Sequence, residues 1–203
     1  MEKSKIVRAV NDQWELFHQQ EQGTERALLT ELGNKLDLEH ILDIAGLRRV
    51  GKTTLLRQLA TNFYEPEEYY TLNFDDDRFL GVEAGDFQGI YEVLLEEFGE
   101  RSTFFLDEVQ NIEGWERFVR RLMDRGFKVI LTGSNSQLLD RELGSKLTGR
   151  HLSHRLFPFS FAEFLRFHSE AVYKGKQHLT TEERARYLKL FKRFLQYGGL
   201  PLY

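Results

Sequence analysis

A run of eight residues in the first third of the chain has the types and spacing that bind a polyphosphate. It reads Gly46-Leu47-Arg48-Arg49-Val50-Gly51-Lys52-Thr53, a full match to the phosphate-loop pattern G-x-x-x-x-G-K-[ST]. The two glycines let the backbone curl, so that successive N–H groups converge on an anion at the start of the following helix. Lys52 would bridge the β- and γ-phosphates, and the hydroxyl of Thr53 would hold Mg²⁺. The pattern therefore predicts a nucleotide site over residues 46–53, with Thr54 included.

Two adjacent carboxylates, Asp107 and Glu108, form a second candidate constellation later in the chain. They directly follow the apolar segment Phe104-Phe105-Leu106, and ligands of open α/β sheets bind at the carboxyl ends of the strands. Asp107 suits the hold on Mg²⁺, while Glu108 can polarise a water that attacks the γ-phosphate in line. The pair favours hydrolysis of the nucleotide over the alternative reading, a solvated acidic turn.

These residues need a scaffold that brings several strand ends together, and the apolar pattern predicts one. Short apolar runs alternate with amphipathic segments and cover residues 41–45, 69–74, 103–106, 127–131 and 151–157. Parallel neighbouring strands require crossover helices between them, as this alternation predicts. We therefore expect an α/β P-loop NTPase core with a five-stranded, mostly parallel sheet.

Helical segments flank the expected core on both sides. We predict a helical N-terminal lead-in over residues 1–40, the ATPase core over 41–160 and a helical C-terminal extension over 161–203. Capping-box patterns precede two apolar faces after Pro158, one at Ser160 and the other at Thr180. Because the last residues are apolar and have no polar tail, we expect the extension to be the truncated start of a lid or winged-helix element.

Composition excludes several classes of protein. A chain of 203 residues with 41% hydrophobic residues, 17 Phe, 8 Tyr and 2 Trp is not disordered. It has no Cys, which excludes disulfides and thiolate metal sites, and no apolar run approaches the ~20 residues that span a bilayer. The N-terminus lacks the apolar stretch of a signal peptide, so we expect a cytoplasmic protein with no membrane partner.

The order of these features resembles a known class of nucleotide-hydrolysing proteins. An inserted strand between the phosphate loop and the acidic strand, with Glu108 beside Asp107, resembles the additional-strand catalytic-glutamate class of P-loop ATPases, which includes the AAA-type proteins. The resemblance implies ATP and Mg²⁺, and it places a polar sensor of the γ-phosphate at Ser134 or Asn135. Ser and Asn are equally suited to cap a helix there. It also implies that Arg150 is an arginine finger supplied to the adjacent subunit of a homo-oligomer.

A series of ordered motifs extends the resemblance over residues 41–203. The motifs are GLRRVGKTT, LNFDD, FLDEVQ, WE, LTGS, TGR, PFSFAEFL and GGLP. They look like those of the prokaryotic AAA-like ATP-binding proteins related to the STAND group. Such proteins generally continue into a winged-helix element and a nuclease-like domain, a region that we expect to be missing here, and a protein or DNA partner would act through that region. The resemblance places Pro201, in the last motif, near the adenine.

We therefore predict ATP binding and Mg-dependent hydrolysis by a domain that drives or gates a partner domain. The main alternative is a non-hydrolysing, ATP-dependent switch or interaction module, in which nucleotide closes the C-terminal part against the core. A GTPase is disfavoured because the base-reading pattern Asn34-Lys35-Leu36-Asp37 lies upstream of the phosphate loop. A small-molecule kinase would normally carry a basic lid and would have less use for Glu108.

Overall fold

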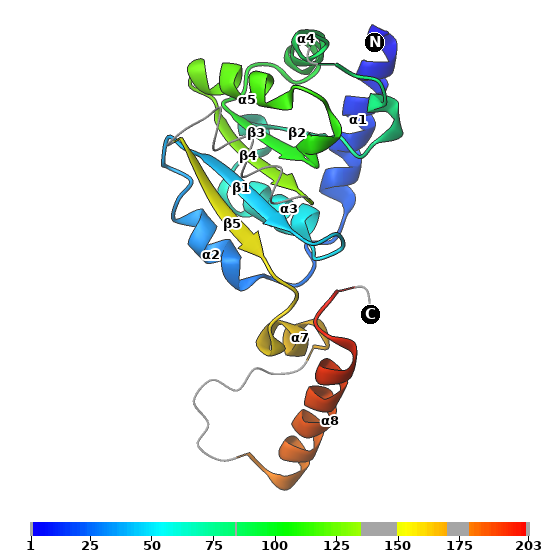
Figure 1. Ribbon diagram of the computed structural model, residues 1–203, viewed down its shortest axis with the longest axis vertical. Helices are drawn as coiled ribbons and strands as arrows, with labels where there is room; N and C mark the ends of the chain where they lie inside the picture. The colour runs from blue at the N-terminus through cyan, green and yellow to red at the C-terminus, as the bar shows by residue number, and fades with distance from the viewer. Residues whose placement is uncertain (1, 84, 135–149, 170–178, 202–203) are drawn as a thin grey trace.

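Five parallel strands form one sheet in the computed structural model, which describes residues 2–83, 85–134, 150–169 and 179–201 (Figure 1). The strands lie in the order β2-β3-β4-β1-β5. Their bounds are Ile41–Gly46 (β1), Tyr69–Asn73 (β2), Thr103–Asp107 (β3), Lys128–Gly133 (β4) and His151–Leu156 (β5). The predicted α/β class and the five expected strands are confirmed, each within two residues at either end. The sheet is parallel throughout, and not only for the most part.

The helices follow the expected alternation with the strands. They are α1 (Lys3–Gln19), α2 (Ala27–Gly33), α3 (Lys52–Phe63), α4 (Phe87–Phe98), α5 (Trp115–Asp124), α7 (Phe161–Phe167) and α8 (Thr181–Tyr197). Helix α3 connects β1 to β2, α4 connects β2 to β3, and α5 connects β3 to β4. In the part of the chain that the structure describes, no helix is both long enough and apolar enough to cross a membrane.

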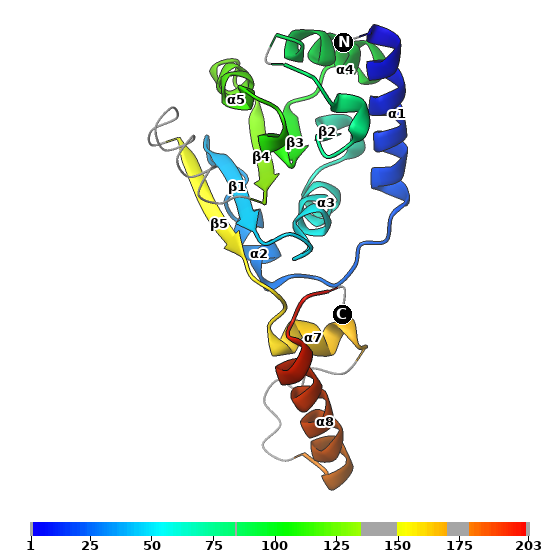
Figure 2. The same ribbon diagram turned by 45° about the vertical axis from the view of Figure 1, so that its right-hand side comes forward.

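Both faces of strands β1 to β4 are covered, which explains why these strands are buried along almost their whole length, whereas the edge strand β5 is only partly buried. Helices α4 and α5 and the first half of α1 cover one face, while α2 and α3 cover the other (Figure 2). Side chains of β3 alternate between these two layers: Phe104 and Leu106 belong to the first, and Phe105 belongs to the second. Helices on both faces of the sheet therefore hold the carboxyl ends of the strands in place.

Helix α1 crosses the edge strand β2 and passes from one layer to the other. Val10 is buried in the α4–α5 layer, whereas Trp14 packs against the α2–α3 layer. Gln13 lies between them and pairs with the backbone of β2 as a neighbouring strand would. Its Nε2 donates to Asn73 O at 3.0 Å, and its Oε1 accepts from Asn73 N at 2.9 Å. These bonds satisfy backbone groups at an otherwise open strand edge.

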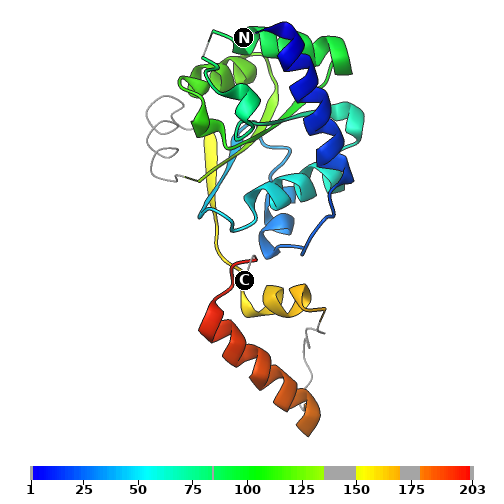
Figure 3. The same ribbon diagram turned by 90° about the vertical axis from the view of Figure 1, so that its right-hand side faces the viewer.

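Helices α7 and α8 extend away from the α/β part, and the described end of the chain returns to the junction between the two (Figure 3). The predicted capping boxes are confirmed: Ser160 caps α7 through Glu163, and Thr180 caps α8 through Glu183. No residue of α8 is fully buried. The extension is therefore attached chiefly through α7 and the residues next to it.

Candidate functional site

The 46–53 loop lies at the carboxyl edge of the sheet, between the end of β1 and the start of α3. Its two fixed glycines are both required by the backbone. A Cβ on Gly46 would lie 2.6 Å from Leu156 O, so no larger residue fits against β5. Gly51 has a φ of +96°, in the left-handed region that glycine adopts without strain. The expected context of the loop, a buried strand before it and a helix after it, is confirmed.

The variable residues of the loop differ in exposure. The side chains of Leu47, Arg48 and Arg49 are exposed, Val50 is fully buried and Thr54 is half-buried. Arg49 has a φ of 66°, a conformation that costs a residue with a Cβ about 1 kcal/mol or more. These residues can meet an anion through their backbone N–H groups, while the two arginine side chains face solvent.

Lys52 is the first residue of α3 and is buried, with 4% of its surface exposed. Its Nζ donates hydrogen bonds to the carbonyl oxygens of Gly46 at 3.3 Å and Leu47 at 3.2 Å. It also donates to Ser134 Oγ at 3.0 Å and lies 3.2 Å from Glu108 Oε1. The ammonium group therefore lies at the mouth of the loop, where the ends of β1, β3 and β4 meet.

Asp107, the last residue of β3, is buried and faces the start of α3. Its Oδ2 accepts a hydrogen bond from Thr53 Oγ1 at 2.6 Å, and its Oδ1 accepts one from Thr132 Oγ1 of β4. Burial raises the pKa of Asp107 above its ordinary value, although both hydroxyl groups act in the opposite direction. A cation at this carboxylate would relieve the cost of burying its charge. Carboxylate and hydroxyl oxygens are hard donors that suit Mg²⁺.

Glu108 follows Asp107 directly, yet its environment has the opposite effect on its pKa. Its carboxylate accepts hydrogen bonds from Ser134 Oγ at 2.8 Å and from Gln110 Nε2, and it lies beside Lys52. Burial raises the pKa of Glu108, but the bonds from Gln110 and Ser134 and the charge of Lys52 outweigh it, so that the pKa lies below its ordinary value. Glu108 is therefore ionised at neutral pH and can accept a proton or orient a water.

Comparison with known proteins determines the family. Residues 38–165 match the family of AAA domains over well more than half of the chain. The chain belongs to this AAA family. It is 36% identical over 167 residues to an uncharacterized protein of Methanocaldococcus jannaschii, covering 82% of this chain and 37% of that protein. It is 33% identical over 172 residues to an uncharacterized protein of Haemophilus influenzae, covering 81% and 40%.

The matched part of this chain spans about two fifths of the length of these two relatives. Solved structures agree on the fold. S. cerevisiae Hsp104, solved as a complex with casein, superposes with a TM-score of 0.58 at 14% identity, covering 95% of this chain and 37% of that one. The Aeropyrum pernix ORC1 protein, solved in complex with DNA, gives 0.51 at 14% identity, covering 70% and 47%. At such low identity the likeness concerns the fold alone.

Arg150 lies far from the other predicted site residues of this AAA domain. It precedes β5 at the amino edge of the sheet, where its carbonyl oxygen accepts a hydrogen bond from Ile41 N at 2.9 Å. Its guanidinium lies 3.4 Å from Asp124, and 64% of the side chain is exposed. The 46–53 loop of the same copy is at the opposite edge. A role as an arginine finger would therefore require a second copy, and it stays a prediction.

The two predicted sensor residues and Pro201 differ in where the structure places them. Ser134 lies between Lys52 and Glu108 and touches both. Asn135 lies outside the residues that the structure describes. Pro201 approaches the loop from the C-terminal extension, since a Cβ on Gly51 would lie 4.0 Å from its ring.

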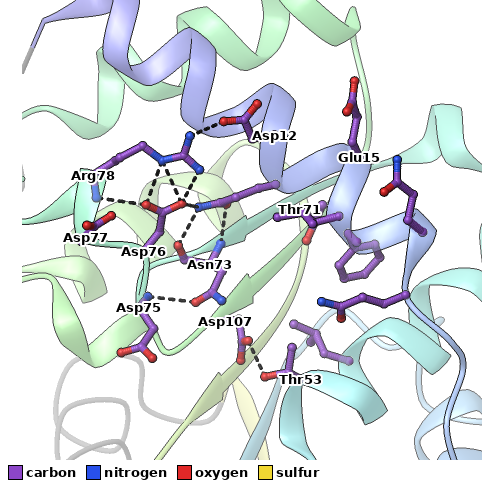
Figure 4. Close-up of a pocket in the computed structure, with 16 residues that line it drawn as sticks. Asp12, Glu15, Thr53, Thr71, Asn73, Asp75, Asp76, Asp77, Arg78 and Asp107 are labelled. Carbon is purple, nitrogen blue, oxygen red and sulfur yellow. Dashed lines mark hydrogen bonds and ion pairs between the residues drawn. The ribbon is translucent and has the colours of Figure 1, made fainter.

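A cavity of about 860 Å³ opens beside Thr53 and Asp107 and reaches toward α1 (Figure 4). Its far wall is the acidic turn after β2, which consists of Asp75, Asp76 and Asp77. Hydrogen bonds from Arg78 lower the pKa of Asp76 to about 2, together with one from Gln13 of α1. The acidic turn therefore anchors α1 to the end of β2.

Three residues that the sequence did not single out complete the surroundings of the site. Thr132 and Gln110 donate to the two carboxylates, and Arg26 donates to the carbonyl oxygen of Val50 inside the loop. A polar residue within an apolar strand was a usable signal for Thr132. Arg26 stands in a polar stretch between α1 and α2 and had no signal of this kind.

Proposed function

We propose that this AAA domain binds ATP together with Mg²⁺ and hydrolyses it. The observation that carries the proposal is the convergence of Lys52, Glu108 and Ser134 at the mouth of the 46–53 loop, next to the Asp107–Thr53 pair. A cation for the phosphates, a base for the water and ligands for a divalent ion are the parts that phosphoryl transfer to water requires.

The binding role falls to the loop and to the residue that ends it. Backbone N–H groups of residues 46–53 and the N-terminus of α3 would face the β- and γ-phosphates, where the helix dipole favours negative charge. Lys52 would exchange its bonds to loop carbonyls for bonds to phosphate oxygens. Thr53 and Asp107 would hold Mg²⁺, which when bound neutralises charge on the phosphates.

The catalytic role falls to Glu108. Its carboxylate is paired with Lys52 at 3.2 Å, and a triphosphate that takes over Lys52 would leave Glu108 free to orient the attacking water. Ser134 donates to Glu108 and accepts from Lys52, so it would respond to the presence of the γ-phosphate, with Asn135 as a further candidate. The site thus joins detection of the triphosphate to positioning of the base.

The wider proposals rest on the family and the resemblance. Pro201 would border the adenine, Arg150 would act on the nucleotide of a second copy, and the domain would drive or gate a partner domain. A protein or DNA partner would be reached through regions that the longer relatives carry. The closer kinship with the STAND group and a cytoplasmic location stay predictions.

A non-hydrolysing switch is the second candidate, and one observation favours it. The Glu108 carboxylate already has three partners, namely Lys52, Gln110 and Ser134. If these bonds persist with nucleotide bound, Glu108 serves to hold the site and not to activate water.

Release of inorganic phosphate from Mg-ATP distinguishes the two functions. Glu108→Gln keeps the size of the side chain but removes the base and one of its two acceptor oxygens, so we expect hydrolysis to slow by about 10²-fold or more while ATP still binds. Glu113→Gln, at a nearby exposed glutamate, is the matched control and should hydrolyse at the normal rate. A slow rate that Glu108→Gln does not change would support the switch over the enzyme.

A further inference from the structure

Arg26 is a buried arginine that touches the 46–53 loop from outside the residues matched to the AAA family. Only 3% of its surface is exposed. Its Nη1 donates to Val50 O at 2.8 Å, its Nη2 donates to Phe157 O at 2.6 Å, and its Nε donates to Glu163 Oε1 at 3.0 Å. The guanidinium also lies 4.8 Å from the centre of the Phe159 ring. One side chain thus joins the loop to the segment between β5 and α7.

The bond to Val50 fixes the orientation of a peptide group inside the loop. In a trans peptide the C=O of one residue and the N–H of the next point in opposite directions. Since Arg26 holds the Val50 carbonyl on one side, the N–H of Gly51 points to the other side, away from Arg26. Gly51 immediately precedes Lys52, and its N–H is one of the groups that would meet the phosphates.

Glu163 accepts a hydrogen bond from the Nε of Arg26, and both of its carboxylate oxygens have further donors. Its Oε1 accepts from Ala27 N at 2.9 Å as well as from Arg26, and its Oε2 accepts from Ser160 N at 2.7 Å and Ser160 Oγ at 2.9 Å. The capping box of α7 therefore orients the carboxylate that orients Arg26. Movement of α7 away from the core would remove the partner of a buried charge.

Helix α3 fixes the linker that carries Arg26. Arg57 and Gln58 of this helix donate to linker oxygens, which belong to Gln20, Glu21, Gln22 and Thr24. A Cβ on Gly23 would lie 2.9 Å from Thr54 Cγ2, so the linker passes directly against the first turn of α3. Arg26 is therefore presented to the loop from a fixed backbone.

We propose that Arg26 is a positioning residue for phosphate binding. It holds the Val50–Gly51 peptide with the Gly51 N–H toward the phosphates, and its pairing with Glu163 makes that geometry depend on the docking of residues 157–165. Because binding free energies are linked reciprocally, phosphates in the loop stabilise the docked C-terminal segment to the same extent. This inference rests on the proposed function, since it assumes that the loop binds a polyphosphate.

Arg26→Gln tests the inference, with Arg57→Gln as the matched control. Arg57 is also buried, at 5% exposure, but its guanidinium donates to Gln20 and Glu21 of the linker and not to the loop. Binding is measured by calorimetric titration with two ligands, Mg-ATP and inorganic triphosphate in the presence of Mg²⁺. The second ligand has the phosphates but no adenine. We expect Arg26→Gln to raise the Kd of both ligands about tenfold or more, as for loss of a hydrogen bond from a charged group. Its effect on Kd should exceed its effect on kcat at saturating ATP. Arg57→Gln loosens the linker but leaves the Arg26–Val50 bond in place, so it should weaken both ligands less than Arg26→Gln does.

Several results would overturn the inference. Equal weakening of ligand binding by both variants would mean that the linker as a whole has loosened. Weaker binding of ATP but not of triphosphate would mean that Arg26 acts on the adenine and not on the phosphates. If Arg26→Gln does not fold, Glu163→Gln takes its place, and triphosphate binding that this variant leaves unchanged would also overturn the inference. Absence of any binding by the unsubstituted chain would instead refute the proposed function, and this inference with it.

Discussion

Two buried charge pairs flank the 46–53 loop, and they differ in how completely they are enclosed. The Lys52–Glu108 pair spans 3.2 Å, with 3% of the Lys52 side chain and 16% of the Glu108 side chain exposed, so only the Glu108 end of this pair is open. The Arg26–Glu163 pair spans 3.0 Å, with 3% and 6% of its side chains exposed. Apart from Ser134 N, the partners of Glu108 are side chains at an open edge, whereas Glu163 also binds two backbone N–H groups.

This difference separates what a ligand can rearrange from what it cannot. Lys52 and Glu108 can each exchange a partner for a phosphate or a water at little cost, because both lie at the mouth of the loop. Arg26 and Glu163 have no such replacement, and leaving either charge buried and unpaired is expensive. The Lys52–Glu108 pair, here called the open pair, is therefore suited to chemistry. The Arg26–Glu163 pair, here called the enclosed pair, is suited to holding the loop and the C-terminal segment together.

Loss of the enclosed pair should have the largest effect on stability. Glu163→Ala leaves Arg26 buried without its carboxylate, so we expect the free energy of unfolding to fall by about 3–5 kcal/mol. Urea denaturation measures this change. Glu96→Ala is the control, because the Lys3–Glu96 pair spans 2.8 Å but is more than half exposed, and its loss should cost less than about 1 kcal/mol. Equal losses in the two variants would erase the distinction between enclosed and open pairs.

Loss of the open pair should affect ligand binding instead. Lys52→Ala removes the cation at the mouth of the loop, and we expect it to abolish the thermal shift that Mg-ATP produces. For the unsubstituted chain that stabilisation is about 2.7 kcal/mol at a ligand concentration of 100 Kd. Lys5→Ala, at an exposed lysine of α1, should retain the full shift. A shift that survives Lys52→Ala would contradict the role of the loop.

Thr132→Val tests the hydroxyl that sits behind the open pair. The substitution keeps the shape of the side chain but leaves Asp107 Oδ1 without its donor, which should cost about 1–3 kcal/mol of unfolding free energy. The pKa of Asp107, already raised by burial, should rise further because one of the bonds that oppose the rise is lost. Added Mg-ATP should therefore recover less stability at acidic pH than in the unsubstituted chain, and identical recovery would count against Asp107 as a magnesium ligand.

Acid should weaken the enclosed pair. Burial raises the pKa of Glu163, but hydrogen bonds from the N–H groups of Ala27 and Ser160 and the pairing with Arg26 lower it more, to below the ordinary value of 4.5. A depressed carboxyl pKa contributes stability that is complete above the unfolded-state value and is lost as the pH falls through the folded-state value. The free energy of unfolding should therefore drop below about pH 4.5, and less steeply in Glu163→Gln. Parallel pH profiles for the two proteins would refute this.

The sheet was predictable because its signals are local. Strands β1 to β4 are short, mostly apolar runs next to amphipathic helices, and both of their faces are covered, so polar alternation hardly disturbs the pattern. The edge strand β5 is more polar, and its Ser153 and Arg155 are exposed. The loop and the acidic pair were predictable for the same reason: residues 46–53 and 107–108 carry their chemistry in adjacent positions. A crossover helix precedes each of β2, β3 and β4, in agreement with the parallel pairing of these strands and β1.

The enclosed pair was not predictable, because its meaning lies in a contact between residues 137 positions apart. The capping-box pattern at Ser160 was recognised, but the second function of its glutamate depends on where α7 packs. Arg26 is one of many charged residues in a polar segment, and nothing in its neighbours indicates burial. Polar residues that are buried by tertiary contacts leave no periodic trace in the sequence.

Arg150→Ala should have the smallest effect on a single copy. Arg150, like Arg26, lies next to a carboxylate, but its side chain is 64% exposed, so removing it should change the free energy of unfolding by less than about 0.5 kcal/mol. Its distance from the loop also means that a monomer should hydrolyse ATP at an unchanged rate. If the protein self-assembles, loss of an arginine supplied in trans should slow hydrolysis by about 10³-fold. Light scattering and the rate per chain at several protein concentrations distinguish these cases. If the protein assembles and Arg150→Ala does not change its hydrolysis rate, Arg150 is a surface residue paired with Asp124. A residue that completes the site of a neighbouring copy must affect the rate whenever that copy is present.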